Sequence, residues 1–304
     1  MSEKSRRDPR KDVVIGDPEP ITEESNVPAS VSRPTSVAQP HLRYKPVRLP
    51  SRGLLYTGVP GGEVQIRKML VAEETALLSA GGDVLTRISR VIQACVSIPG
   101  GMRHEDLLLV DRFYLLIALR TDSLGPSYNF SFRCEHCGQI NKTTIDIVKE
   151  LNEKVAVPDG ANGHLEVPTA EGEAENAVVL YEPIETKLVD LDATVGLRFL
   201  RGSDEAEITR QASRVRARGD GADPTLPMRL ARHIVTVDGI ELSLLERESL
   251  ARRLTMRDSA TIRLAIEAHE PGIDTTVVRD CTSCGGTNAQ SMPFTAEFFR
   301  PTHL

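Results

Sequence analysis

The sequence contains no tryptophan, and aromatic residues make up only 4% of its 304 residues. A core built around large aromatic rings is therefore excluded, and the buried side chains must be mainly Leu, Val, Ile and Ala. Hydrophobic residues make up 40% of the chain, which is enough for a sizeable core in a protein of this length. We therefore expect a globular protein with an aliphatic interior.

Long apolar runs are also missing. No segment approaches the roughly 18 to 20 apolar residues that a membrane-spanning helix needs, and the charged N-terminus is not followed by the apolar stretch of a signal peptide. A formal net charge of −6 opposes the electrostatic attraction that gives nucleic-acid binders much of their affinity. We expect a soluble protein that is made in the cytoplasm and has no membrane partner, and nucleic acid is a disfavoured partner.

Three common catalytic signatures are absent as well. The sequence has no GxxxxGK phosphate-binding loop, no GxSxG nucleophile elbow and no HExxH zinc-binding helix. These absences exclude the commonest nucleotide-binding, hydrolase and metalloprotease classes.

Four of the five cysteines form two CxxC pairs, Cys134 with Cys137 and Cys281 with Cys284. In a reducing compartment, paired cysteines with an odd total indicate metal binding rather than disulfides. The fifth, Cys95, lies on the apolar stripe of a predicted amphipathic helix, so we expect it to be a small buried residue.

Zinc is the predicted metal. Zn²⁺ prefers a tetrahedron of thiolates, and CxxC spacing lets one tight turn present two of them. Gly138 and Gly285 directly follow the second cysteine of each pair, where such a turn needs the conformational freedom of glycine. Four protein ligands leave no position for water, so the predicted zinc is structural. The alternatives are redox-active or incidental pairs, and replacement of one sulfur by His136.

Alternating apolar and polar residues flank both pairs, as they do in β-hairpins. YNFSFR and NKTTIDI surround the first pair, and DTTVVRD and AQSMPF surround the second. We therefore predict two hairpins, each with a cysteine-containing turn at its tip, which we call a knuckle.

The segment between the knuckles is long enough to form a domain, so its ends must lie close together. Capping boxes are predicted at Ser243 with Glu246 and at Thr255 with Asp258. We predict an α+β fold, in which a small β-hairpin zinc ribbon is joined to a helical core, with a strand-then-helix insertion between the two cysteine knuckles. The predicted parts are a disordered Pro/Ser-rich arm, an α+β core with the first knuckle, an inserted mostly helical region, and the second knuckle with the C-terminal tail, at 1–46, 47–147, 148–273 and 274–304.

Several motifs together resemble one family. They are LPSRGLLY (49–56), DRFYLLIALRTDSLG (111–125), FRCEHCG (132–138), CTSCGG (281–286) and FFRP (298–301). Taken together they are similar to the baseplate hub assembly family of T-even-type phages, over most of the chain from about residue 46 onward.

This resemblance implies a non-enzymatic structural or assembly protein at the hub of a contractile-tail baseplate. Its partners would be other phage tail or baseplate proteins, and it would act in the host cytoplasm during assembly or remain in the virion. The residues expected to form exposed partner-binding surfaces lie in the first and last of these motifs, and they are Leu49, Leu54, Tyr56, Phe298 and Phe299.

Two other classes stay open. The first is a nucleic-acid-binding zinc ribbon, but such a protein would carry basic and aromatic residues on its knuckles. The tips here carry instead Glu135, His136, Thr282 and Ser283. The second is an enzyme that uses the thiols or an unrecognised site.

Overall fold

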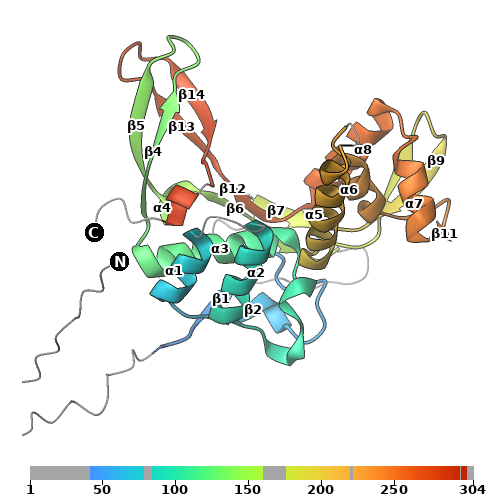
Figure 1. Ribbon diagram of the computed structural model, residues 1–304, viewed down its shortest axis with the longest axis horizontal. Helices are drawn as coiled ribbons and strands as arrows, with labels where there is room; N and C mark the ends of the chain where they lie inside the picture. Colours follow the sequence, from blue (N-terminus) through green and yellow to red (C-terminus); the bar gives the residue numbers. More distant parts are fainter. Residues whose placement is uncertain (1–41, 79–83, 160–175, 220–221, 295, 300–304) are drawn as a thin grey trace, which may run out of the picture. The chain divides into compact units, whose positions relative to one another are not determined.

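The computed structural model describes residues 42–78, 84–159, 176–219, 222–294 and 296–299 (Figure 1). The arm predicted for the N-terminus lies outside these ranges up to residue 41. Helices and several small sheets occur together, which confirms the predicted α+β class. The buried apolar side chains form three clusters, and each cluster belongs to a different part of the fold.

The N-terminal cluster packs a three-stranded antiparallel sheet against three helices. The last of these helices is α3 (Leu109–Leu124). The elements that precede it are β1 (Lys45–Arg48), β2 (Glu63–Ile66), α1 (Val71–Leu78), α2 (Val84–Cys95), β3 (Val96–Ser97) and the 3-10 turns Pro60–Gly62, Pro99–Gly101 and His104–Asp106. Cys95 is buried at the end of α2, and burial raises the pKa of its thiol to about 11. The helical spacing of this cysteine therefore predicted its environment correctly.

Helix α3 (Leu109–Leu124) contacts all three clusters. Leu115 packs in the N-terminal cluster. Ile117 packs in a second cluster, which lies beneath the two hairpins and includes Tyr128 and Phe298. Val110 packs against the third cluster, which belongs to the inserted segment. A helix that is apolar on most sides is buried by several neighbours. This arrangement explains the near-continuous apolar run in its sequence.

Two antiparallel hairpins present the knuckles (Figure 1). Strand β4 (Ser127–Arg133) pairs with β5 (Ile140–Asp146), and β13 (Thr276–Asp280) pairs with β14 (Thr287–Ser291). In β4, Tyr128, Phe130 and Phe132 are buried in alternation, as expected for a strand with one face in a core. Helix α4 (Ile147–Glu150) ends the first hairpin.

A third sheet brings the two hairpins together at their bases. Strand β6 (Asn152–Val157) pairs in parallel with β7 (Ala177–Val179) and antiparallel with β12 (Gly272–Asp274). Because β6 follows the first hairpin and β12 precedes the second, the pair Asn152 and Asp274 joins the two ends of the inserted segment. The expected return of these ends is thus confirmed.

The inserted segment contains a four-stranded antiparallel sheet of order β11-β10-β9-β8 besides its helices. Its elements are β8 (Ile184–Leu188), β9 (Ala193–Leu197), α5 (Gly202–Ala217), α6 (Thr225–His233), β10 (Ile234–Val237), β11 (Ile240–Glu241), α7 (Leu244–Ala251) and α8 (Met256–His269). The prediction of a mostly helical insertion missed this sheet, because strands of two to five residues carry little periodic signal. Among the helices described, none combines the length and apolar character that crossing a bilayer requires.

One of the two predicted capping boxes is only half formed. Ser243 and Glu246 exchange both hydrogen bonds at the start of α7. At α8 the Asp258 N–H donates to Thr255 Oγ1 at 3.1 Å, but the Asp258 carboxylate accepts instead from the N–H groups of Asp190 and Leu191. Asp258 therefore holds the β8–β9 turn against the helix.

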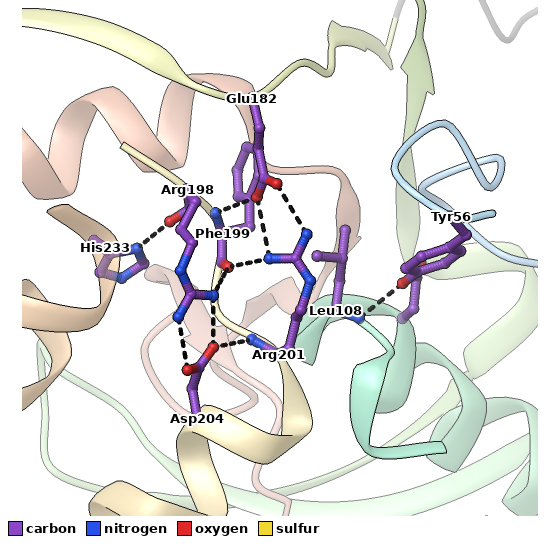
Figure 2. A network of polar contacts seen from close by, with 9 residues as sticks. Tyr56, Leu108, Glu182, Arg198, Phe199, Arg201, Asp204 and His233 are labelled. Carbon is purple, nitrogen blue, oxygen red and sulfur yellow. Dashed lines mark hydrogen bonds and ion pairs between the residues drawn. The ribbon is translucent and has the colours of Figure 1, made fainter. Parts of the chain in front are cut away.

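A polar network fixes the chain between β9 and α5 (Figure 2). The Arg198 guanidinium forms a bidentate ion pair with the Asp204 carboxylate, with N–O distances of 2.7 and 2.8 Å. The backbone N–H of Arg201 donates to the same carboxylate at 3.0 Å. Glu182 accepts from the Phe199 N–H at 2.6 Å and from the Arg201 guanidinium at 2.9 Å. Bidentate, partly buried pairs of this kind are stronger than ordinary surface pairs.

The same stretch of chain pairs with the start of α3. The Leu109 N–H donates to the Leu200 carbonyl, and the Gly202 N–H donates to the Leu107 carbonyl, both at 3.0 Å. These bonds attach the inserted segment directly to the N-terminal core.

Candidate metal centre

The two knuckles have the same backbone geometry. In the first, the Gly138 N–H donates to the Cys134 carbonyl, and in the second the Gly285 N–H donates to the Cys281 carbonyl, each at 2.9 Å. The φ angles of these glycines are +74° and +70°, in the left-handed region where a side chain would be strained. Both turns therefore need glycine immediately after their second cysteine.

The four thiols of these turns converge on one point. All four sulfur atoms lie within 4.8 Å of one another, and they belong to Cys134, Cys137, Cys281 and Cys284. The distances Cys134 Sγ to Cys284 Sγ and Cys137 Sγ to Cys281 Sγ are both 3.7 Å. Four sulfurs at a Zn–S distance of about 2.3 Å would stand about 3.8 Å apart at the corners of a tetrahedron. The thiol group therefore fits a zinc ion.

Backbone N–H groups stabilise the ionised form of one thiol in each knuckle, Cys134 in the first and Cys281 in the second. The His136 N–H lies 3.4 Å from Cys134 Sγ, and the Ser283 N–H lies 3.4 Å from Cys281 Sγ. The N–H groups of Cys284 and Ser283 hold the pKa of Cys281 below its usual range. A thiolate is the form that ligates metal, so Cys134 and Cys281 are suited to that role. At Cys137 the hydrogen bond from the Gln139 N–H is outweighed by desolvation and the neighbouring thiols, so the pKa of this thiol is raised instead.

His136 does not join the thiol group. Its Nε2 lies 3.0 Å from the Thr287 carbonyl oxygen, on the opposite hairpin. The ring lies over Gly286, where a Cβ would come within 2.4 Å of it. His136 therefore packs the two knuckles together instead of replacing a sulfur.

Asn141 and Asn288 were missed by the sequence analysis, although both contact a knuckle. Asn288 accepts from the Glu135 N–H and Asn141 accepts from the Thr282 N–H, each at 2.9 Å. The available signal was a repeat, because CEHCGQIN and CTSCGGTN share an asparagine four residues after the second cysteine. Each asparagine contacts the knuckle of the other hairpin.

The first motif of the resemblance is held against helix α3 by a buried carboxylate. Asp111 is fully buried and accepts from the Ser51 N–H at 3.1 Å and from the Tyr56 hydroxyl. The Tyr56 hydroxyl accepts in turn from the Leu108 N–H at 2.7 Å (Figure 2). Burial raises the pKa of Tyr56, so its hydroxyl stays protonated and donates to Asp111.

The exposure expected for this motif is wrong at two of its three candidate residues. Leu49 is 0% exposed in the N-terminal cluster, and Tyr56 is partly buried against Asp111. Only Leu54, at 40% exposure, presents its side chain to solvent. The turn folds back tightly at Gly53, where a Cβ would lie 2.2 Å from the Val59 carbonyl oxygen.

The C-terminal motif is also internal. Phe298 is 0% exposed, and its carbonyl accepts from Arg120 Nε at 3.3 Å. Its ring packs against Tyr128, and Phe299 packs partly buried between two clusters. The expectation of an exposed surface is therefore wrong for Phe298, because its ring fills the core beneath the hairpins.

The buried Asp111 makes stability depend on pH in a defined direction. Burial raises its pKa to about 6 from 3.8. Between these values the folded state binds more protons than the unfolded state, so the contribution of Asp111 to the free energy of unfolding falls as pH rises. The full decrease is about 3 kcal/mol, at about 1.4 kcal/mol per pKa unit.

We expect Asp111→Asn to remove this decrease, which urea denaturation between pH 4 and pH 7 would measure. Asp192→Asn is the matched control, because its exposed carboxylate has a pKa lowered by a hydrogen bond from Lys187 and titrates below this window. Parallel pH profiles for Asp111→Asn and the unsubstituted protein would contradict the assignment.

Comparison with known proteins identifies part of the chain. No curated protein and no solved structure gave a match. The family described as T4 bacteriophage base plate protein matches residues 51–185. This segment includes Tyr56, Asp111 and the first knuckle, and it ends before the second knuckle. Over residues 51–185 the chain is therefore similar to the T4 bacteriophage base plate protein family, and this match supports the resemblance to a phage baseplate protein stated from the sequence.

Proposed function

We propose that this protein is a non-enzymatic structural or assembly component of a contractile phage tail, at the hub of its baseplate. The observation that carries the proposal is the family match over residues 51–185. Asp111, in the motif at 111–125, accepts hydrogen bonds from Ser51 and Tyr56 in the motif at 49–56. These hydrogen bonds hold the turn that presents Leu54 to partners.

The metal in this proposal is a structural zinc ion held by Cys134, Cys137, Cys281 and Cys284. Four thiolates would occupy all positions of the zinc tetrahedron, so no position is left for water or substrate. When bound, the ion supplies a cross-link between two hairpins that are far apart in sequence. This closed ligand set favours a structural over a catalytic role.

The partners in this proposal are other tail or baseplate proteins. The protein meets them in the host cytoplasm during assembly, and as a structural component it would remain in the virion with the baseplate. Leu54 is the candidate contact from the sequence motifs that remains exposed. Burial of this exposed apolar side chain against a partner would be favourable.

A phage that lacks this reading frame provides the test. We expect electron microscopy of its lysates to show heads with missing or malformed baseplates. Normal infectious particles would contradict the proposal. Filter binding with salt-dependent retention of DNA or RNA would favour the nucleic-acid alternative instead.

The proposed contact at Leu54 leads to a separate prediction. We expect Leu54→Asp to lower the titre of infectious particles by roughly tenfold or more when it complements the deletion, because a charge would enter an apolar interface. Its melting temperature should stay within a few degrees of the unsubstituted protein. Leu245→Asp is the matched control, because Leu245 is an exposed leucine in α7. Equal titres for both variants would remove Leu54 from the interface.

A further inference from the structure

The two knuckles are related by an approximate two-fold repeat that extends beyond the cysteines. Asn141 lies at the start of β5 and Asn288 at the start of β14, at equivalent places after their knuckles. Their exposed fractions are 3% and 1%, so both amides are buried although they belong to small hairpins. Buried amides need hydrogen-bond partners for both ends of the group.

Each amide finds these partners partly on the opposite hairpin. Asn288 Oδ1 accepts from the Glu135 N–H at 2.9 Å, while its Nδ2 donates to the Gly286 carbonyl at 2.7 Å. The first bond joins Asn288 to the first residue inside the other knuckle, and the second bond stays within its own hairpin. The equivalent asparagine repeats this pattern in the reverse direction.

Asn141 Oδ1 accepts from the Thr282 N–H at 2.9 Å and from the Thr282 hydroxyl at 2.8 Å. Its Nδ2 donates to the Gln139 carbonyl at 3.1 Å and to Cys281 Sγ at 3.4 Å. The second of these bonds is made directly to a candidate metal ligand. It compensates negative charge on the sulfur.

We propose that Asn141 and Asn288 are positioning residues that hold the two knuckles in register, so that the four thiols are preassembled before metal binds. This inference rests on the proposed zinc site. Outer groups that orient metal ligands commonly change metal affinity by 10- to 100-fold when they are replaced. Here each asparagine orients the knuckle of the other hairpin, so residues far apart in sequence support each other's metal ligands.

Asparagine is required because the amide both donates and accepts. Aspartate has nearly the same shape and keeps the acceptor for the opposite N–H, but it loses the donor to the turn carbonyl and adds a negative charge beside the thiolates. Asn141→Asp and Asn288→Asp therefore test the hydrogen bonds that the amide nitrogen donates. Asn141→Ala and Asn288→Ala remove both the donor and the acceptor of the amide. Asn129→Asp is the matched control, because Asn129 lies on β4 and its side chain contacts Thr144 instead of a knuckle.

The first measurement is the affinity for Zn²⁺ in competition with a chromophoric chelator, together with the thiolate absorption of the Co²⁺ form. We expect both aspartate variants to bind Zn²⁺ 10- to 100-fold more weakly, with Asn129→Asp unchanged. Affinities within about twofold of the unsubstituted protein for both aspartate variants would overturn the proposal.

The second measurement is amide hydrogen exchange in metal-free protein, which tests the asparagines separately from zinc. Asn288→Ala should accelerate exchange at Glu135, and Asn141→Ala should accelerate it at Thr282, each by up to about tenfold. Equal acceleration at both amides in either variant would overturn the crosswise assignment. If the unsubstituted protein binds neither Zn²⁺ nor Co²⁺, the proposed zinc site fails, while the crosswise exchange pattern still decides the role of the asparagines.

Discussion

Replacing Cys137 and Cys284 with serine is expected to abolish binding of one equivalent of zinc and to release the two hairpins from their metal cross-link, while the crosswise hydrogen bonds of Asn141 and Asn288 still hold the knuckles in register. These two thiols are the exposed members of the group, one from each knuckle. Their loss should therefore remove ligands without leaving a new cavity in the core. Since zinc binding contributes on the order of 10 kcal/mol to the folding of small zinc-binding peptides, this is the largest effect that we expect at the ribbon.

Native mass spectrometry would measure the zinc stoichiometry, and hydrogen exchange along β13 and β14 would measure the release. The helices outside the ribbon should keep their protection, because β6 and β12 still join the ends of the inserted segment. Cys95→Ala is the control, because this buried thiol lies in α2 and outside the thiol group. Zinc retained at one equivalent by the double variant would contradict the four-thiol site.

Phe298→Ala is expected to destabilise the protein by about 3 to 5 kcal/mol, the usual cost of removing a fully buried aromatic ring. The ring contacts Tyr128, Phe294 and Phe299 at centroid distances of 5.1, 4.9 and 5.1 Å. The guanidinium of Arg120 also lies 5.5 Å from its centroid.

Thermal denaturation would measure the loss, as a decrease of about 10 °C in melting temperature. Phe294→Ala is the matched control with a smaller expected effect, because Phe294 is partly exposed. Zinc stoichiometry should be unchanged in both variants. A melting temperature of Phe298→Ala equal to that of the unsubstituted protein would show that the ring is not part of the core. Any defect in phage assembly would then have to arise from a direct contact.

The knuckles and most helices could be predicted because their signals are local. Gly138 and Gly285 stand directly beside the cysteines that require them, and Ser243 lies three residues from its capping partner. Helix α2 carries its apolar stripe within twelve residues. Determinants of this kind need no knowledge of distant segments, so the order of residues is enough to recognise them.

The inserted sheet could not be predicted in the same way. Strand β11 has two residues and β10 has four, so neither shows a clear alternation. The pairing of β10 with β9 depends on chain segments that meet only after folding. The redirected carboxylate of Asp258 was missed for a similar reason, because its acceptor role serves a turn that precedes it by 67 residues.

The amino-acid order alone specified which thiols pair into knuckles, where α7 and α8 begin, and that the fold combines helices with strands. The tertiary structure decided that Leu49 and Phe298 are buried while Leu54 is exposed, and that Asn288 reaches Glu135 across 153 residues. The physical reason is the range of the interactions. Turn geometry and capping are set by neighbours in the chain, whereas burial and crosswise hydrogen bonds depend on which distant segments pack together.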